Sequence, residues 1–123
     1  MGFMLTDKDR KQILANFLET IEGISDKEYQ KRVWIRGEGP EVDDFTETVC
    51  HFFDDGDPIL KKYKEYNIIE KQYRLLVQFR KEFESFVDGD RPYLPEEFID
   101  TPEWKQIMSL AKNVLKAFDY QKG

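Results

Sequence analysis

The apolar residues near the start of the chain follow a helical pattern. They recur every three or four positions, as expected for one buried face of a helix. They are Ile13, Leu14, Phe17, Leu18 and Ile21. Thr6 is a suitable N-cap residue, and Gly23 is typical of the position just beyond the end of a helix. The pattern therefore predicts a first helix between Thr6 and Gly23.

A second helix is predicted directly afterwards. Ser25 and Glu28 have the spacing of a capping box, in which a hydroxyl and a carboxylate each bind a free backbone N–H group. The helix should continue through Tyr29 and Val33 to Trp34. It should end before residues 37–40, because this sequence contains two glycines and a proline.

A third helix is predicted from Pro40, a residue suited to a first helical turn, to Gly56. Its predicted core stripe consists of Val42, Phe45, Val49, Phe52 and Phe53. Asp57 and Pro58 then have the character of an N-cap and a first helical residue. They predict a short, separate basic helix, whose lysines are Lys61, Lys62 and Lys64.

The last part of the chain predicts two long helices and one helical turn. Asn67 and Glu70 have capping-box spacing and begin the longest predicted helix, which should end near Val87. Its residues available for burial are Tyr73, Leu76, Val77, Phe83 and Phe86. Residues 95–99 can form one helical turn, and Thr101 caps the last helix. The apolar face of that helix is Trp104, Ile107, Met108, Ala111, Val114, Leu115 and Phe118.

These patterns together predict the fold class. No segment alternates with the period of two that is typical of a strand. A chain of 123 residues is long enough for one core and too short to divide comfortably into two. We therefore predict an all-α fold, a bundle of five or six helices in a single domain over residues 1–123. The single cysteine excludes an internal disulfide, and we see no signal peptide or membrane span, so we expect a cytoplasmic protein.

Negative charge is concentrated in residues 37–60. This stretch contains eight acidic residues and no Lys or Arg. The chain has a formal net charge of −6, so the stretch carries −8 and the remainder sums to +2. The acidic residues are Glu38, Glu41, Asp43, Asp44, Glu47, Asp54, Asp55 and Asp57.

This charge predicts a basic partner. On a helix, the residues opposite the predicted core stripe are Asp44, Glu47, His51 and Asp54, with Asp55 close by. A concentrated negative face attracts a basic protein and argues against direct binding to nucleic acid or an anionic membrane. We predict that the partner is bound by Asp43, Asp44, Glu47, His51, Asp54, Asp55 and Asp57, with Trp34 and Tyr63 as aromatic anchors. A place in the core is an equal alternative for Trp34 and for most of the tyrosines.

The sequence also allows enzymatic interpretations. Two acid pairs, Glu19 with Glu22 and Asp44 with Glu47, resemble the paired acids of all-α nucleoside-triphosphate pyrophosphohydrolases, although the second pair has Asp and Glu in swapped order. Glu47 and His51 could ligate a divalent ion, but a solvated acidic helix face is the simpler interpretation. Cys50 and His51 are neighbours and cannot form a catalytic dyad with each other. We therefore predict no catalytic residue, metal site or cofactor, and keep the hydrolase as the alternative.

Residues 33–60 and 94–120 look like segments of small bacterial immunity proteins, in particular those paired with contact-dependent growth inhibition toxins. The resemblance lies in general character, an acidic helical domain rich in aromatic residues, and not in a short diagnostic motif. It implies a protein that binds and neutralises a cognate toxin domain, often a basic nuclease. The acidic residues would then meet Lys and Arg of the toxin. A non-enzymatic adaptor for a basic protein is a further alternative.

Overall fold

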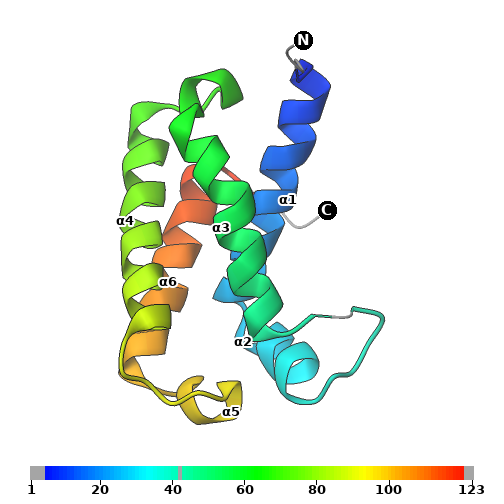
Figure 1. Cartoon of the computed structure of the whole chain (residues 1–123), viewed down its shortest axis with the longest axis vertical. Helices are drawn as coiled ribbons and strands as arrows, with labels where there is room; N and C mark the ends of the chain where they lie inside the picture. Colours follow the sequence, from blue (N-terminus) through cyan, green and yellow to red (C-terminus); the bar gives the residue numbers. More distant parts are fainter. Residues whose placement is uncertain (1–4, 42, 121–123) are drawn as a thin grey trace.

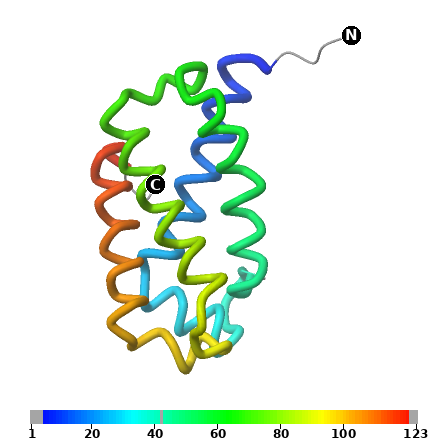
Figure 2. Tube along the Cα trace, turned by 60° about the vertical axis from the view of Figure 1, so that its left-hand side comes forward, coloured from blue at the N-terminus to red at the C-terminus, as the bar shows by residue number. Residues whose placement is uncertain are grey.

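The structure is a computed structural model that describes residues 5–41 and 43–120. This part of the chain contains helices and no β-strand, which confirms the prediction of an all-α fold. Four long helices run side by side along the long axis of the molecule (Figures 1 and 2). They are α1 (Asp7–Ser25), α3 (Phe45–Lys61), α4 (Glu70–Asp88) and α6 (Pro102–Ala117). The short elements are α2 (Lys27–Tyr29), η1 (Gln30–Ile35), η2 (Tyr63–Tyr66) and α5 (Pro95–Phe98).

Helix α1 begins where the sequence predicts and ends later. Thr6 Oγ1 accepts a hydrogen bond from Asp9 N, and Asp9 Oδ2 accepts one from Thr6 N, both at 3.0 Å. The predicted end at Gly23 is wrong, because α1 continues to Ser25. A Cβ atom on Gly23 would lie 3.2 Å from Tyr29 Cε1, so this glycine makes room for an aromatic ring and does not end the helix.

The segment after α1 is capped by Asp26 and not by Ser25, so the predicted capping box is wrong. Asp26 Oδ1 accepts hydrogen bonds from Glu28 N at 3.1 Å and Tyr29 N at 3.2 Å. The Ser25 hydroxyl donates instead to the carbonyl oxygen of Glu22. After α2 the backbone changes to the wider π-helical turn of η1, which ends at Ile35.

Helix α3 begins at Phe45 and not at Pro40. Its N-cap is Asp44, whose Oδ1 accepts a hydrogen bond from Glu47 N at 2.8 Å. The predicted core position Val42 lies outside the described residues. The N-terminal part of the acidic stretch is therefore a loop that leads into α3.

The predicted end of the third helix at Gly56 is wrong, because α3 continues through Pro58 to Lys61. Gly56 is buried against α1, and a Cβ atom there would lie only 2.7 Å from Phe17 Cε1. Ile59 is fully buried and extends the apolar stripe by another turn. This burial favours helix even though Pro58 has no backbone N–H group to donate. The predicted separate basic helix is replaced by the single 3-10 turn η2.

Helix α4 has a different cap from the one predicted, and its buried face agrees with the prediction except at Val77 and Phe79. Its N-cap is Ile69, whose backbone N–H donates to Gln72 Oε1 at 2.9 Å. Asn67 instead ends η2 in the left-handed conformation, with φ of 59°. Val77 is exposed and does not contribute to the core. The fully buried residues of α4 are Leu76, Phe79 and Phe83.

The last helix agrees with the prediction, and its first aromatic residue lies at the centre of the core. Thr101 Oγ1 accepts a hydrogen bond from Trp104 N at 3.2 Å, which caps α6. The indole of Trp104 is fully buried. Rings in contact with it come from η1, α3, α4 and α5: Trp34, Phe45, Phe83, Phe86 and Phe98. Within the described ranges, no helix is long and apolar enough to cross a membrane.

Candidate functional site

Asp43 holds the start of the acidic stretch against the body of the protein. Its carboxylate accepts hydrogen bonds from Tyr29 Oη at 2.8 Å, Trp34 Nε1 at 3.2 Å and Thr48 Oγ1 at 3.0 Å. This contact affects the pKa of Tyr29, which is half-buried. Burial, followed by the hydrogen bond to Asp43, raises the pKa of the Tyr29 hydroxyl well above its usual range. Asp43 therefore joins α2, η1 and α3.

Two arginines that lie outside the acidic stretch form ion pairs with the loop between η1 and α3. Arg32 donates to both carboxylate oxygens of Glu41, each at 2.8 Å. Arg36 pairs with Glu38. Two of the eight acidic residues are thus balanced by cations that precede them in the sequence.

A groove lies where α1, α2 and the first half of α3 meet, and it encloses about 590 Å³. Helices α1 and α3 lie side by side in Figure 1. The ionisable residues that line the groove, together with Tyr29, are Glu19, Glu22, Asp26, Glu41, Asp43, His51 and Asp55. We call this surface the acidic groove.

The acidic groove is strongly negative. Six carboxylates line it, of which Glu41 is paired with Arg32 from outside the groove, and no Lys or Arg is among its described lining residues. Glu19 and Asp55 form no ion pair or side-chain hydrogen bond with any residue in the described part of the chain. Burial, followed by the charges of Glu22 and Glu19, also raises the pKa of Tyr120. The groove can therefore accept one or more cationic groups.

The side chains of the predicted acidic face of α3 point in three different directions. His51 and Asp55 turn toward α1 and line the acidic groove. Glu47 and Asp54 are exposed, and neither forms an ion pair with a described residue. Asp57 turns toward α4, where Arg80 Nε donates to Asp57 Oδ1 at 2.7 Å and Arg80 Nη2 donates to Asp57 Oδ2 at 3.2 Å. Glu47 and Asp54 form what we call the outer ridge.

The two predicted aromatic anchors have structural contacts and lie far from each other. Trp34 is buried, with 9% of its surface exposed, and takes the alternative place in the core. Tyr63 lies beyond the far end of α3, about 25 Å of helix away from Asp43. Its ring stacks on Tyr73 with centroids 3.9 Å apart, and its hydroxyl donates to Glu70 Oε2 at 3.0 Å. The structure does not bring either residue into the acidic groove.

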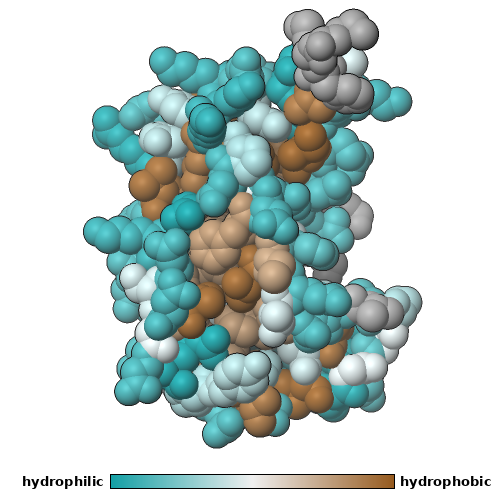
Figure 3. Space-filling view, in the orientation of Figure 1, coloured by the Kyte–Doolittle hydropathy of each residue, from teal (hydrophilic) through white to brown (hydrophobic). Residues whose placement is uncertain are grey.

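The opposite flank of α3 is apolar. Figure 3 shows brown apolar surface in the middle of the molecule, between α3 and α4. On this side Phe53 is half-buried, its ring stacks on Phe83, and the Arg80 guanidinium lies 5.1 Å from its centroid. On this flank the acidic residue Asp57 is paired with Arg80, so the acidic residues of α3 without an ion pair lie in the groove and on the outer ridge.

The residues of the alternative hydrolase are only partly brought together. Glu19 and Glu22 line the acidic groove, whereas Asp44 caps α3 and Glu47 belongs to the outer ridge. Among residues 5–41 and 43–120, no group of three or more His, Cys, Asp or Glu side chains has the geometry to hold a metal ion. The swapped second pair therefore does not face the first pair across the groove.

The sequence associates Glu19 and Glu22 with the acidic stretch only in the hydrolase alternative, and it does not associate Asp26 with it. Their spacing contained the signal, since residues three to four positions apart share one face of a helix. What was missing was the pairing of α1 with α3, which depends on Phe17 packing on Gly56.

No protein-family model, curated protein or solved structure matches this chain.

Proposed function

We propose that this protein binds and neutralises a basic protein domain, as an immunity protein does with its toxin. The acidic groove carries the proposal, because six carboxylates line it without a Lys or Arg among its described residues. A lysine or arginine entering the groove would form charge-assisted hydrogen bonds with several carboxylates. A toxin that binds nucleic acid, such as a nuclease, presents such residues around its active site.

The outer ridge would extend this surface. Glu47 and Asp54 lie on the same helix as His51 and Asp55. They are exposed and lie outside the groove, whereas His51 and Asp55 line it. A partner seated on the acidic groove can contact the outer ridge as well. The summed negative field would also speed association with a basic partner, and this effect would weaken as salt is added.

The groove is held in place before any partner binds. Three donors fix the carboxylate of Asp43, and Arg32 fixes that of Glu41. A fixed surface loses little conformational entropy on binding, which favours tight inhibition. We place this activity in the cytoplasm, where an immunity protein meets a toxin domain that has entered the cell.

Capture from a lysate of the source cell tests the proposal, with three versions of the protein as bait. The groove variant is Glu19→Gln/Asp55→Asn. The control variant, Glu96→Gln/Glu97→Gln, removes the same charge from exposed residues of α5. The wild type and the control should retain one basic protein at low salt and release it at high salt, and the groove variant should lose it. Equal capture by the groove variant would contradict the proposal.

A second assay separates neutralisation from the alternatives. Added at equal concentration, the wild type should abolish the nuclease or other toxic activity of the captured protein. Binding without inhibition would instead indicate an adaptor. Turnover of nucleoside triphosphates with Mg²⁺, lost in Glu19→Gln, would indicate the hydrolase.

A further inference from the structure

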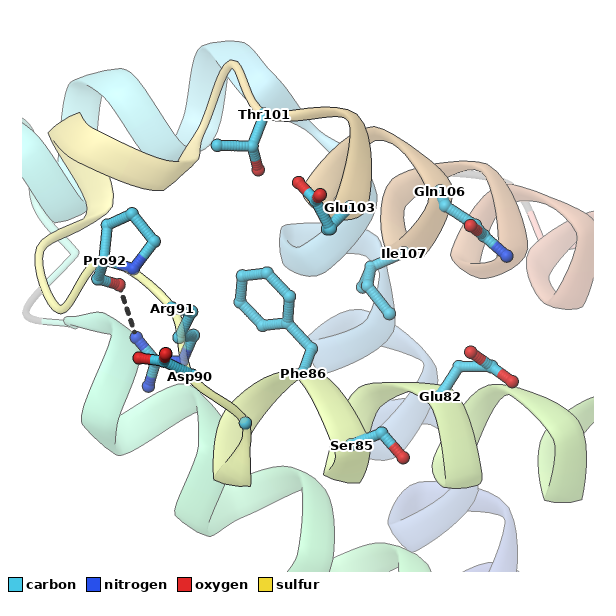
Figure 4. Close-up of a pocket in the computed structure, with 11 residues that line it drawn as sticks. Glu82, Ser85, Phe86, Asp90, Arg91, Pro92, Thr101, Glu103, Gln106 and Ile107 are labelled. Atoms are coloured by element: carbon cyan, nitrogen blue, oxygen red, sulfur yellow. Dashed lines mark hydrogen bonds between the residues drawn. The ribbon is translucent and has the colours of Figure 1, made fainter.

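A second concave surface lies between α4 and α6 and uses no residue of the acidic groove (Figure 4). It encloses about 390 Å³, between the second half of α4, the turn at residues 89–92 and the first turns of α6. Figure 4 shows the side chains of Phe86 and Ile107 pointing into the space between the two helices. These side chains and Pro92 give the pocket apolar walls. We call it the α4–α6 pocket.

The rim of the α4–α6 pocket is acidic. Glu82, Asp90 and Glu103 line it, and each comes from a different segment. Arg91 also lines the pocket, but its guanidinium lies over aromatic rings, 5.4 Å from the centroid of Phe86. Three carboxylates and one guanidinium therefore line the pocket, and their formal charges sum to −2.

The backbone contacts of Arg91 fix it in this position. Its Nη1 donates to the carbonyl oxygens of Pro92 at 2.9 Å and Tyr93 at 3.3 Å. The same guanidinium lies 5.2 Å from the ring centroid of Phe45 and 5.5 Å from that of Phe98. These contacts connect the turn that carries Arg91 to aromatic rings of α3 and α5.

The end of α4 adds to the negative potential of the pocket. The helix ends at Asp88, and its last turn contains no Lys or Arg. The unpaired carbonyl groups at a helix C-terminus carry partial negative charge and favour a nearby cation. Ser85, whose carbonyl oxygen lies beside Gly89, belongs to this last turn and lines the pocket.

Exposed apolar residues continue from the pocket along the chain. Tyr93 is 78% exposed and Leu94 is 44% exposed, directly after Pro92. Neither side chain is buried in the fold, and Tyr is a frequent anchor residue at protein interfaces. In the sequence, these two exposed apolar residues directly follow Pro92, which lines the pocket.

We propose that the α4–α6 pocket receives an arginine side chain of a second protein, with apolar residues of that protein lying on Tyr93 and Leu94. The aliphatic part of arginine would pack on Phe86 and Ile107. Its planar guanidinium would donate to the carboxylates of the rim in the paired geometry that a lysine lacks. The pocket shares no lining residue with the acidic groove, so this inference does not depend on the proposed function.

The test uses two defined probes, the peptide acetyl-Leu-Arg-Leu-amide and the same peptide with citrulline, which has the shape of arginine without its charge. Backbone amide NMR signals of the whole protein are followed during each titration. The arginine peptide should shift signals at Ser85, Gly89 and Thr101, and the citrulline peptide should bind at least about tenfold more weakly. Equal binding of both peptides, or shifts confined to the acidic groove, would overturn the proposal.

Two variants test the acidic rim and the exposed Tyr93 separately. Glu82→Gln/Glu103→Gln should weaken binding of the arginine peptide at least about fivefold, because it removes two of the three rim charges. Tyr93→Ser, on an exposed side chain, should weaken it without unfolding the protein. Glu96→Gln/Glu97→Gln again serves as the charge-matched control. Binding that is unchanged in both the rim variant and Tyr93→Ser would place the peptide elsewhere.

Discussion

Gln30 and Trp104 are joined inside the core by a hydrogen bond of 2.9 Å between Gln30 Oε1 and Trp104 Nε1. The Gln30 amide nitrogen also donates to the carbonyl oxygens of Gly23 at 3.1 Å and Ile24 at 2.9 Å. Gln30 is fully buried, and its side chain thus links η1 to both α1 and α6. This contact fixes the corner of the bundle from which the acidic groove is built.

Replacing Gln30 by leucine should destabilise the protein by about 2–3 kcal/mol, because it removes the partner of a buried indole N–H group and of the Ile24 carbonyl oxygen, while the Gly23 carbonyl oxygen keeps only the hydrogen bond from Asp26 N. Denaturant unfolding of Gln30→Leu measures the loss. Gln78→Leu, on an exposed position of α4, is the matched control and should change stability by less than about 0.5 kcal/mol. Similar effects of both substitutions would mean that the Gln30 network contributes little.

Gly56→Ala should destabilise the protein although alanine is the better helix former. The added Cβ would lie 2.7 Å from Phe17 Cε1, and such overpacking costs about 1–3 kcal/mol. Phe17→Leu removes the opposing ring edge. In a double-mutant cycle, Gly56→Ala should therefore cost less in the Phe17→Leu background than in the wild type. Additive effects would contradict direct packing of Phe17 on Gly56.

The same contact explains where sequence reasoning succeeded and where it failed. The N-caps at Thr6 and Thr101 depend on neighbours within one turn, and both were predicted correctly. Gly23 and Gly56 were interpreted as helix ends because glycine often has that role. Both instead accommodate rings from other parts of the chain, Tyr29 and Phe17. Phe17 and Gly56 are far apart in the sequence, and the contact of Tyr29 with Gly23 depends on the turn after α1, so neither contact leaves a local pattern.

The candidate site, like the fold, could be predicted only in part from the sequence. The acidic stretch was visible in the sequence, and it does supply Glu41, Asp43, His51 and Asp55 to the acidic groove. The sequence could not show that α1 supplies the other wall. It also could not show that Arg80 turns Asp57 away toward α4, since the two residues are 23 positions apart.

Phe83→Ala should destabilise the protein by about 3–5 kcal/mol, because the side chain is fully buried and contacts several rings. Val77→Ala on the same helix is the control, since Val77 is 40% exposed, and it should cost less than about 1 kcal/mol. Denaturant unfolding compares the two variants. A larger loss from Val77→Ala would show that α4 is rotated relative to the structure.

The raised pKa of Tyr29 predicts a change in stability at alkaline pH. The pKa of its hydroxyl is raised above the ordinary value of 10.0 in the folded chain, so its contribution is fully present below pH 10 and is lost as the pH rises above that value. Tyr29→Phe removes the hydrogen bond to Asp43 and should cost about 1–2 kcal/mol near neutral pH. The difference from the wild type should shrink above pH 10 in denaturant unfolding. A difference independent of pH would contradict this coupling.

The most direct test of the central claim is the affinity of the captured basic protein for the wild type and for Glu19→Gln/Asp55→Asn, measured by calorimetry at low and moderate salt. If the acidic groove is the binding site, the groove variant should bind at least about tenfold more weakly and should lose much of the salt dependence. The control Glu96→Gln/Glu97→Gln should bind like the wild type. Affinities of the groove variant and the wild type within about twofold of each other at both salt concentrations would contradict the account.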